Sequence, residues 1–537
     1  MRYAQFSLTL ALIFLLSCSG GPSDSPALDV PAVVEFSGAI PGDLETVDQV
    51  VNAGPFAAEW PSLEQNGIPD WYKDAKLGIF IHWGVYAVPA FGNEWYPRNM
   101  YIDQVDQGRG VNPFQHHIKT FGPQKEFGYK DFIPMFKAEN YDPAAWAALF
   151  EEAGARYVVP VAEHHDGFSM YANSYTKWDA SEMGPGRDLL AGLEQAVRAR
   201  GMKFGVSSHR AFNWAYFARD ESFDTVDEEN FGLYGKPRED LFNQDGHRGW
   251  PPQDQEFKDD WLARTAELVE KFQVDLIWFD FGIGPEWTEL PAEQNHWAPE
   301  LRKFAAYYYN RSKAWGKTGV INYKHQAFPE NAAVLDLERA RLSGMREPFW
   351  QTDTSVSFSS WGYVTNHRYK DVGLIVTEFV DIVSKNGCLL LNIGPKPDGT
   401  IPGKEAEMLR AIGGWLKING EAIYGSRPWK TWGEGPTETV EGHLSEERNK
   451  RLTAEDIRYT TKGDQLYAIA LGWPTKEWRM TLLGSDSEHL AGQKVASLEL
   501  LGSSERITFE QGAGALTVQR PASKPNDYAY VFKVGLE

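Results

Sequence analysis

The chain has 537 residues, of which 42% are hydrophobic, 14% aromatic and 24% charged. This apolar content is enough for a large buried core, and it excludes collagen, coiled-coil and wholly disordered classes. The formal net charge of −21 would repel a phosphate backbone, so we expect no nucleic-acid partner.

Residues 1–17 are predicted to be an export signal. Arg2 precedes an apolar run from Phe6 to Leu16, which is shorter than the about 20 residues that a membrane span requires. The run ends in LLSC followed by SGGPS, a pattern that resembles a bacterial lipoprotein signal in which Cys18 is lipidated. An ordinary signal peptide containing a cysteine is the alternative. We therefore expect an exported protein that contacts the membrane only through a lipid anchor, on the periplasmic face of the bacterial envelope or at the cell surface.

Residues 18–55 are rich in Pro, Gly, Ser and Asp, which predicts a tether and lead-in segment. From residue 56 to about 428, short apolar runs recur, each of about four to eight residues, as in strands buried on both faces of a parallel sheet. These runs are Leu77–Trp83, Tyr157–Ala162, Phe204–Ser207, Val274–Asp280, Val320–Tyr323, Val334–Glu338, Trp350–Val356 and Cys388–Ile393.

Amphipathic helical patterns lie between several of these runs. Trp146, Leu149 and Phe150 share one helical face, and residues 298–315 and 369–385 also have helical periodicity. Eight strands alternating with helices predict an α/β fold, an irregular (β/α)8 TIM-like barrel over residues 56–428. The irregularity lies at the fifth to seventh runs, which are too close together for full helices between them. An open doubly wound sheet is the alternative, but no Gly-rich phosphate loop follows the first run.

After residue 428 the helical periodicity fades and short β-like runs separated by turn residues take its place. This pattern predicts a C-terminal antiparallel β-sandwich over residues 429–537. Its predicted strands are Gln465–Ala470, Arg479–Leu483, Ala496–Leu501, Leu516–Gln519 and Tyr528–Val534.

Several barrel strands end in groups that can carry chemistry. The first run reaches His82, the second leads into His164 and His165, the fourth ends at Asp280, and the sixth ends at Glu338. Active sites of such barrels lie at the C-terminal ends of the strands, so these side chains are expected on one rim. Each carboxylate also has a structural interpretation, because Asp280 could cap a helix and Glu338 could pair with Arg339.

A metal site is a competing interpretation of the histidines, with Glu163 or Asp166 as a carboxylate ligand. Adjacent histidines on an extended segment point to opposite faces, however, so His164 and His165 would seldom reach one ion. The sequence also lacks a His-Glu-x-x-His motif. We therefore favour imidazoles that bind hydroxyl groups, and we expect no metal and no other cofactor. Tryptophans near the strand ends favour a carbohydrate, because Trp rings stack on the apolar faces of sugars.

Six motifs occur in the order found in one known family. They are WYKDAKLGIFIHWG at residues 71–84, EWY at 94–96, HHDGF at 164–168, WFD at 278–280, SWGY at 360–363 and LNIGP at 391–395. Together they resemble the α-L-fucosidases of glycoside hydrolase family 29. The resemblance implies a retaining exo-acting enzyme that hydrolyses terminal α-L-fucose from glycans by double displacement, with fucosylated oligosaccharides or glycoconjugates as substrates.

The resemblance also implies roles for individual residues. Asp280 matches the catalytic nucleophile, and Glu338 best matches the acid/base, with Glu286 and Asp336 as alternatives. The residues that match the binding site for the terminal sugar are His82, Glu94, Trp95, His164 and His165. Retention requires two carboxyl groups about 5–5.5 Å apart. The nucleophile must be ionised, and we expect the acid/base to hold a proton near neutral pH through partial burial.

The chain departs from the family at residues 207–214, where many members carry a Tyr followed by Glu-Trp and this chain reads SSHRAFNW. Because that segment should border the sugar, His209 joins the candidate binding residues, as does Trp278. The departure leaves the sugar itself open, since α-L-galactose differs from α-L-fucose only by a 6-hydroxyl. An α-L-galactosidase or related L-sugar glycosidase is therefore one alternative, and a catalytically silent glycan-binding lipoprotein is another.

Overall fold

The computed structural model describes residues 30–106, 110–237, 253–284 and 291–537. The predicted signal with Cys18 and the alternative acid/base Glu286 lie outside these described residues. Within the described ranges, no helix combines the length and the apolar character that a membrane crossing requires.

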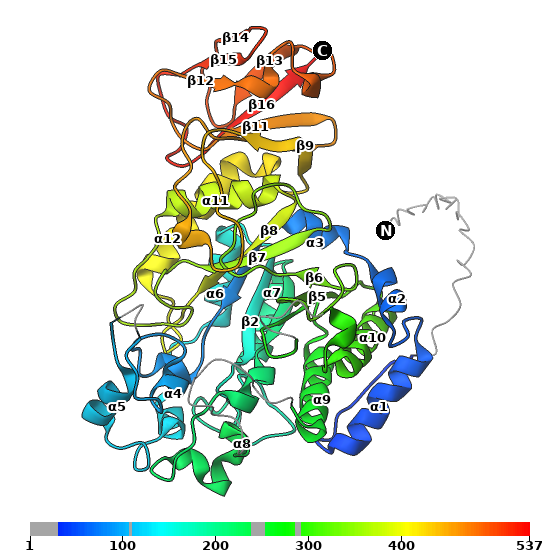
Figure 1. Ribbon diagram of the computed structural model, residues 1–537, viewed down its shortest axis with the longest axis vertical. Coiled ribbons are helices and arrows are strands. Elements are labelled where there is room, and N and C mark those ends of the chain that lie inside the picture. Colours follow the sequence, from blue (N-terminus) through cyan, green and yellow to red (C-terminus); the bar gives the residue numbers. More distant parts are fainter. Residues whose placement is uncertain (1–29, 107–109, 238–252, 285–290) are drawn as a thin grey trace, which may run out of the picture.

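Eight parallel strands form the centre of the molecule, in the order β6-β5-β4-β3-β2-β1-β8-β7 (Figure 1). They are β1 (Leu77–Ile81), β2 (Tyr157–Glu163), β3 (Lys203–Ser208), β4 (Leu276–Phe279), β5 (Val320–Tyr323), β6 (Val334–Leu335), β7 (Trp350–Ser355) and β8 (Gly387–Ile393). Between β6 and β7 only an isolated bridge from Asp336 to Gln351 closes the circle. This nearly closed barrel confirms the predicted TIM-like fold, and every strand arises from a run that the sequence predicted.

Helices surround the barrel. The longer ones are α1 (Ile40–Ala53), α5 (Pro113–Phe121), α6 (Pro143–Glu152), α7 (Leu189–Ala199), α9 (Gln255–Phe272), α10 (Ala298–Ala314), α11 (Val372–Ser384) and α12 (Gly403–Asn419). The short ones are α2 (Trp60–Leu63), α3 (Asp70–Ala75), α4 (Tyr96–Asn99) and α8 (Phe231–Tyr234). At the starts of four of the longer helices, α6, α7, α9 and α11, an aspartate side chain accepts hydrogen bonds from backbone N–H groups. These caps are Asp142, Asp188, Asp254 and Asp371. The described residues between β5 and β7 contain no helix, as the close spacing of those runs predicts.

The lead-in segment differs from the prediction. Residues 40–53 were expected to belong to a tether, but they form α1, which packs against α9 and α10 on the side of the barrel. Val47 and Val50 are fully buried there, and Asp43 accepts a hydrogen bond from Tyr175 at 2.8 Å. Burial of this apolar face outweighs the flexible composition of the surrounding residues, so the folded part begins before residue 56.

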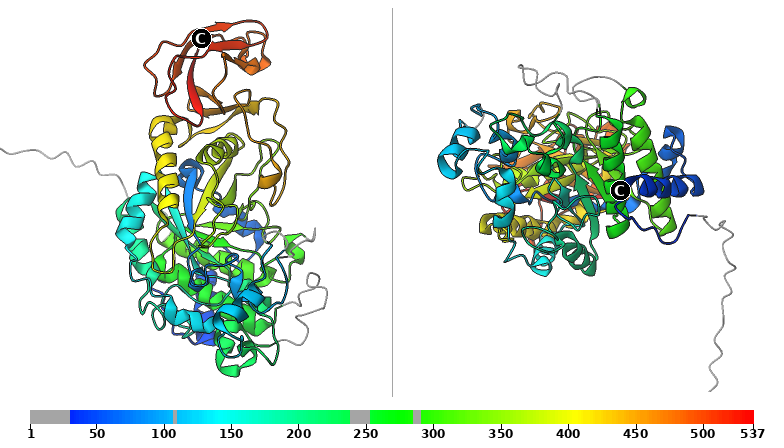
Figure 2. Two further views of the ribbon diagram at one scale, coloured as in Figure 1. Left: turned by 90° about the vertical axis from the view of Figure 1, so that its left-hand side faces the viewer. Right: turned by 90° about the horizontal axis from the view of Figure 1, so that it is seen from below.

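The C-terminal part contains two antiparallel sheets, stacked on one end of the long molecule (Figure 2). Their strands are β9 (Arg427–Glu434), β10 (Ile457–Lys462), β11 (Gln465–Ala470), β12 (Glu477–Met480), β13 (Val495–Leu500), β14 (Phe509–Gln511), β15 (Leu516–Gln519) and β16 (Tyr530–Leu536). The orders β13-β16-β11-β10-β9 and β12-β15-β14 enclose one apolar core, in which Trp478 of one sheet contacts Phe532 of the other. The predicted antiparallel architecture is confirmed. The sequence pattern missed β9, β10 and β14, because polar residues in these strands obscure the apolar alternation.

Candidate active site

A small pocket lies at the C-terminal ends of the barrel strands and gathers most of the predicted site residues. Its lining consists of His82, Glu94, Trp95, His164, His165, Trp278, Asp280, Phe281, Lys324, Glu338, Asp353 and Trp361. His82 follows β1, Asp280 follows β4 and Lys324 follows β5, so the parallel strands deliver them to one rim. Of the predicted site residues within the described ranges, His209 does not belong to this lining.

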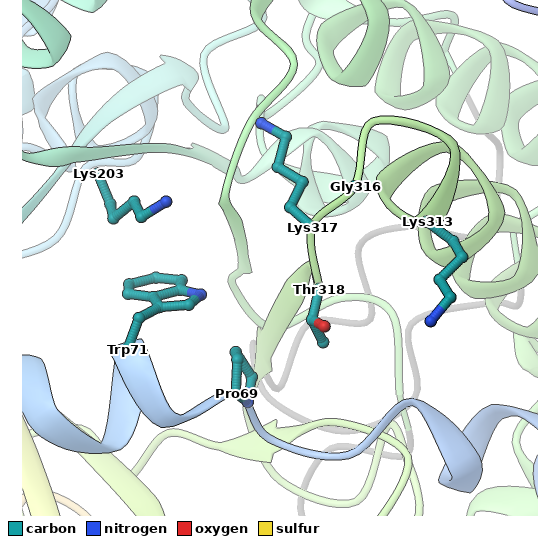
Figure 3. Close-up of a pocket in the computed structure, with 7 residues that line it drawn as sticks. All are labelled: Pro69, Trp71, Lys203, Lys313, Gly316, Lys317 and Thr318. Atoms are coloured by element: carbon teal, nitrogen blue, oxygen red, sulfur yellow. The ribbon is translucent and has the colours of Figure 1, made fainter. Parts of the chain in front are cut away.

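A larger pocket lies at the opposite end of the barrel, with a volume of about 410 Å³ compared with about 60 Å³ for the first pocket. Figure 3 shows its lining, in which Lys203 lies beside Trp71 and Lys317 reaches in from the loop before β5. Both lysines pair with the buried carboxylate of Asp275, which does not belong to the lining, at 3.4 and 3.5 Å. Facing carboxyl groups line the small pocket and not the large one, so chemistry rather than volume identifies the candidate site.

Asp280 is a buried carboxylate surrounded by donors. Its Oδ2 accepts a hydrogen bond from His209 Nδ1 at 2.9 Å and lies 3.1 Å from His165 Nε2. Its Oδ1 accepts from the Phe281 backbone N–H at 2.9 Å and lies 3.1 Å from the Lys324 ammonium. Burial alone would raise the pKa of Asp280, but Lys324 and the two imidazoles lower this pKa well below its ordinary value. The site therefore holds an ionised carboxylate in a fixed orientation.

Lys324 connects the two candidate catalytic carboxylates and is absent from the site residues predicted from the sequence. Its ammonium lies 3.1 Å from Asp280 and 2.6 Å from Glu338. Because one atom contacts both groups, their nearest oxygens are no farther apart than the sum of these contacts, about 5.7 Å. The signal that could have revealed Lys324 is its position directly after the buried strand β5, the same rule that singled out Asp280.

Glu338 lines the pocket with a side chain that is 16% exposed. Burial favours a raised pKa, but the Lys324 ammonium outweighs it, and the pKa of Glu338 falls below its ordinary value. The expectation that Glu338 holds a proton near neutral pH is therefore not met in this structure, and Lys324 is the physical reason. Arg339 is not among the largest causes of this shift, and its guanidinium binds Glu446 at 2.5 Å.

The alternative acid/base residues are placed differently. Asp336 is buried and does not belong to the pocket lining, and its Oδ2 accepts a hydrogen bond from Trp278 Nε1 at 3.0 Å. Glu286 lies outside the described residues. Of the two candidates within the described residues, Glu338 is thus the one whose carboxylate faces Asp280 across the pocket, with Lys324 between them.

Several lining residues are held in place by partners behind the pocket. His82 Nδ1 donates to Asn392 Oδ1 at 2.7 Å, so its Nε2 is left as an acceptor. Glu94 Oε2 accepts from Ser360 Oγ and from the Trp361 backbone N–H, both at 2.9 Å. These bonds fix the imidazole and the carboxylate before any ligand arrives, which reduces the entropy lost on binding.

Two buried polar atoms of the lining have no hydrogen-bond partner among the described residues. They are Nδ1 of His164 and Oδ1 of Asp353. Unpaired buried polar atoms are rare and costly in native structures. Burial and the neighbouring Asp336 also raise the pKa of Asp353 well above its ordinary value, and a hydrogen bond between these two carboxyl groups contributes to the rise. Both atoms indicate a ligand that carries hydroxyl groups.

His164 and His165 both reach the pocket, with ring centroids 4.7 Å apart. The strand alternation that predicted opposite faces ends at Glu163, where β2 stops. The chain then turns, with the Gly167 N–H donating to the His164 carbonyl at 3.1 Å, and both rings come to the same side. Local turn geometry overrides the two-residue period of the strand.

His209 lies behind Asp280. Its Nδ1 donates to Asp280, and its Nε2 is 3.0 Å from the Ser207 hydroxyl. Burial lowers the pKa of His209 to about 4, so the ring is neutral, with the proton on Nδ1 and with Nε2 accepting from Ser207. These contacts support a role in orienting Asp280 rather than in touching a ligand.

Within the part of the chain that the structure describes, two groups of three side chains have ligand atoms within 4.8 Å of one another, His82–His164–His209 and His165–His209–Asp280. Both groups require His209, whose two nitrogens already have partners. The second also requires Asp280, which the Lys324 ammonium contacts. A metal ion would have to displace these bonds and tolerate a nearby positive charge, so the donor set fits a polar organic ligand better.

Comparisons with known proteins agree with this geometry. The profile of the α-L-fucosidase family matches residues 44–421, and that of the α-L-fucosidase C-terminal domain matches residues 449–535. Tissue α-L-fucosidase of Rattus norvegicus is 32% identical over 81% of this chain and 85% of its own length. The human tissue enzyme is 32% identical over 81% of this chain and 82% of its own. The crystal structure of Thermotoga maritima α-fucosidase is similar with a TM-score of 0.69 and 28% identity, covering 89% of this chain and 100% of that one.

Proposed function

The chain belongs to the α-L-fucosidase family, glycoside hydrolase family 29, and we propose that it is a retaining exo-acting enzyme that removes terminal α-L-fucose from fucosylated glycans. The observation that carries the retaining mechanism is the Lys324 ammonium between Asp280 and Glu338. It limits the gap between their nearest oxygens to about 5.7 Å. Retaining glycosidases separate their carboxyl groups by about 5–5.5 Å, whereas inverting enzymes leave more room for a water molecule.

In the first step, the ionised carboxylate of Asp280 forms a bond to the anomeric carbon while the glycosidic C–O bond breaks. Glu338 gives its proton to the departing oxygen. In the second step, Glu338 takes a proton from a water molecule, whose oxygen bonds to the anomeric carbon and releases Asp280. Two inversions at one carbon leave the product with the configuration of the substrate.

Glu338 must acquire a proton before it can act as the acid. A sugar ring between the carboxylates would lengthen the contact between Lys324 and Glu338. Burial then raises the pKa of Glu338, because the charge that offset burial has withdrawn. Asp280 keeps its negative charge through the hydrogen bond from His209 and the contact with His165. Substrate binding thus pushes the two carboxyl groups toward different protonation states.

The test of this proposal is the stereochemistry of hydrolysis. We expect turnover of 4-nitrophenyl α-L-fucoside, with α-L-fucose as the first product in a time-resolved proton NMR spectrum. β-L-fucose as the first product would contradict retention. Faster turnover of the matched α-L-galactoside would identify α-L-galactose, not fucose, as the preferred sugar. Fucose binding in calorimetry without turnover of aryl or natural fucosides would favour a silent glycan-binding protein.

Removal of the Lys324 charge is expected to move the pH profile. In the wild type, kcat/KM should fall as pH rises from the acidic range toward neutrality, because the free enzyme holds Glu338 at a lowered pKa. Lys324→Met raises the pKa values of Asp280 and Glu338. Both the rising and the falling limb of the kcat/KM profile should therefore shift to higher pH by about one unit or more. Lys324→Arg keeps the charge and is the control. An unchanged profile in the methionine variant would contradict the role given to Lys324.

We also propose that the protein is exported and lipid-anchored through Cys18 in a bacterial envelope, on the basis of residues 1–22. In a bacterial host we expect the wild type in the membrane fraction, with a mature N-terminal cysteine that carries acyl chains in mass spectra. Cys18→Ser should leave the signal uncleaved by the lipoprotein route and remove the acyl chains. Recovery of the wild type as a soluble, unacylated protein would reject the anchor without affecting the proposed activity.

A further inference from the structure

A segment of the C-terminal part returns to the barrel rim. In Figure 2 (left) the yellow-orange chain after β9 descends from the C-terminal sheets toward the barrel. Residues 442–446 run alongside residues 338–341. The Leu444 N–H donates to the Glu338 backbone carbonyl and the Glu446 N–H donates to the Arg339 backbone carbonyl, both at 2.9 Å. The contact lies at the open seam of the barrel, next to the bridge between β6 and β7. The backbone that carries Glu338 is thus paired with a segment from between β9 and β10.

This pairing is anchored by a buried carboxylate. Glu446 binds Arg339 at 2.5 Å, Lys370 at 2.6 Å and the Thr354 hydroxyl at 2.6 Å. Although burial opposes ionisation, Lys370 and Arg339 lower the pKa of Glu446 to about 2. Buried, fully partnered ion pairs are costly to break, because removal of one partner leaves an uncompensated charge. The segment therefore has a defined position beside Glu338.

The segment brings His443 close to His325, with ring centroids 5.4 Å apart. His325 follows Lys324 directly, and the electrostatic field of Glu338 acts on both imidazoles. Burial lowers the pKa of His325 to about 4 and also lowers that of His443, so both rings are neutral. A neutral imidazole offers one hydrogen-bond donor and one acceptor, the combination that suits sugar hydroxyl groups.

Neither imidazole belongs to the lining of the pocket that contains Asp280, and both side chains are half-buried. They therefore lie outside the pocket for the terminal sugar, on the side of Glu338. An acid that protonates the leaving oxygen must face the residue that carries this oxygen. In the proposed reaction, the sugar released from fucose therefore leaves on the Glu338 side of the pocket, the side on which the imidazole pair lies.

We propose that His325 and His443 form a binding site for the leaving sugar, a neutral hydroxyl-bearing saccharide, and that the segment 442–446 thereby helps to select the glycosidic linkage. This inference rests on the proposed function. It gives the C-terminal part a direct role in specificity, because His443 reaches the site only through the pairing of its segment with residues 338–341.

The test compares substrates that share fucose and differ in the leaving group. His443→Ala and His325→Ala are assayed on 4-nitrophenyl α-L-fucoside and on fucosyl disaccharides with α1,2, α1,3, α1,4 and α1,6 linkages. For the linkage that the wild type prefers, kcat/KM is expected to fall at least about tenfold, because hydrogen bonds to the leaving sugar are lost. The nitrophenyl substrate should lose less than about threefold, since a good leaving group needs little of this binding. Leu444→Ala, whose side chain is 50% exposed in the same segment, should change neither value.

A second measurement uses the same site to bind a sugar that accepts fucose instead of a sugar that is released from it. With lactose added as an acceptor, the fraction of fucose transferred to sugar rather than to water should fall in both histidine variants. Equal losses on aryl and disaccharide substrates, or no loss on either, would overturn the proposal. Melting curves identify a variant that misfolds, and His443→Gln then replaces it. A wild type that cleaves no fucoside would reject the proposed function itself, whereas an active wild type with unselective variants rejects only this site.

Discussion

Asp280→Gly is expected to lower kcat/KM on 4-nitrophenyl α-L-fucoside by at least about a thousand-fold, because the first step then lacks the carboxylate that bonds to the anomeric carbon. Fucose binding should survive, with an affinity in calorimetry within about tenfold of the wild type. The pocket retains its shape in this variant, since Lys324 keeps Glu338 as a partner and His209 keeps Ser207.

Added azide distinguishes a missing nucleophile from a damaged pocket. In Asp280→Gly, azide can enter the vacated space, attack the anomeric carbon and displace nitrophenolate, which gives β-L-fucosyl azide. The control is Glu447→Ala, which removes an exposed carboxylate paired only with Arg368 among the described contacts and should leave kcat/KM unchanged. Substantial activity of the glycine variant without azide would show that Asp280 is not the nucleophile.

The sequence was sufficient for the barrel and for much of the site because both follow from local patterns. Strands buried on two faces leave continuous apolar runs, and the residue that ends such a run lies on the rim. Asp280 after β4 and His82 after β1 could be placed by this rule alone. The convergence of His164 and His165 could not, because it depends on a turn after Glu163 that changes the direction of the second ring.

Electrostatic effects at the site were harder to predict because they depend on distances between segments far apart in the sequence. From the sequence, Arg339 was a possible ion-pair partner of Glu338 because it is the next residue, although strand alternation points its side chain the other way. In the structure Arg339 binds Glu446, and the effective charge is Lys324, 2.6 Å from Glu338. Glu446 lies in a segment of polar residues without apolar periodicity, so no pattern in the sequence indicated that it returns to the barrel.

Glu338→Ala is expected to affect substrates according to their leaving group. With fucosyl disaccharides, the first step lacks its acid, and kcat/KM should fall by at least about a hundred- to a thousand-fold. With 4-nitrophenyl α-L-fucoside the leaving group needs little protonation, so kcat/KM should fall much less. The second step then becomes slow because no base activates water, and kcat falls while KM falls with it, as fucosyl-enzyme accumulates.

Azide gives the two carboxylates opposite stereochemical signatures. In Glu338→Ala, Asp280 still forms the fucosyl-enzyme, and azide attacks this intermediate from the face that Glu338 vacated. The product is then α-L-fucosyl azide, whereas Asp280→Gly gives the β anomer.

Asp336→Asn is the matched comparison, because Asp336 is the alternative acid that lies buried outside the pocket lining. Should azide rescue Asp336→Asn and not Glu338→Ala, the acid/base would be Asp336. If it rescues neither, Glu286 becomes the candidate. Opposite anomers from Asp280→Gly and Glu338→Ala require one carboxylate on each face of the sugar, which is the arrangement that the Lys324 bridge predicts.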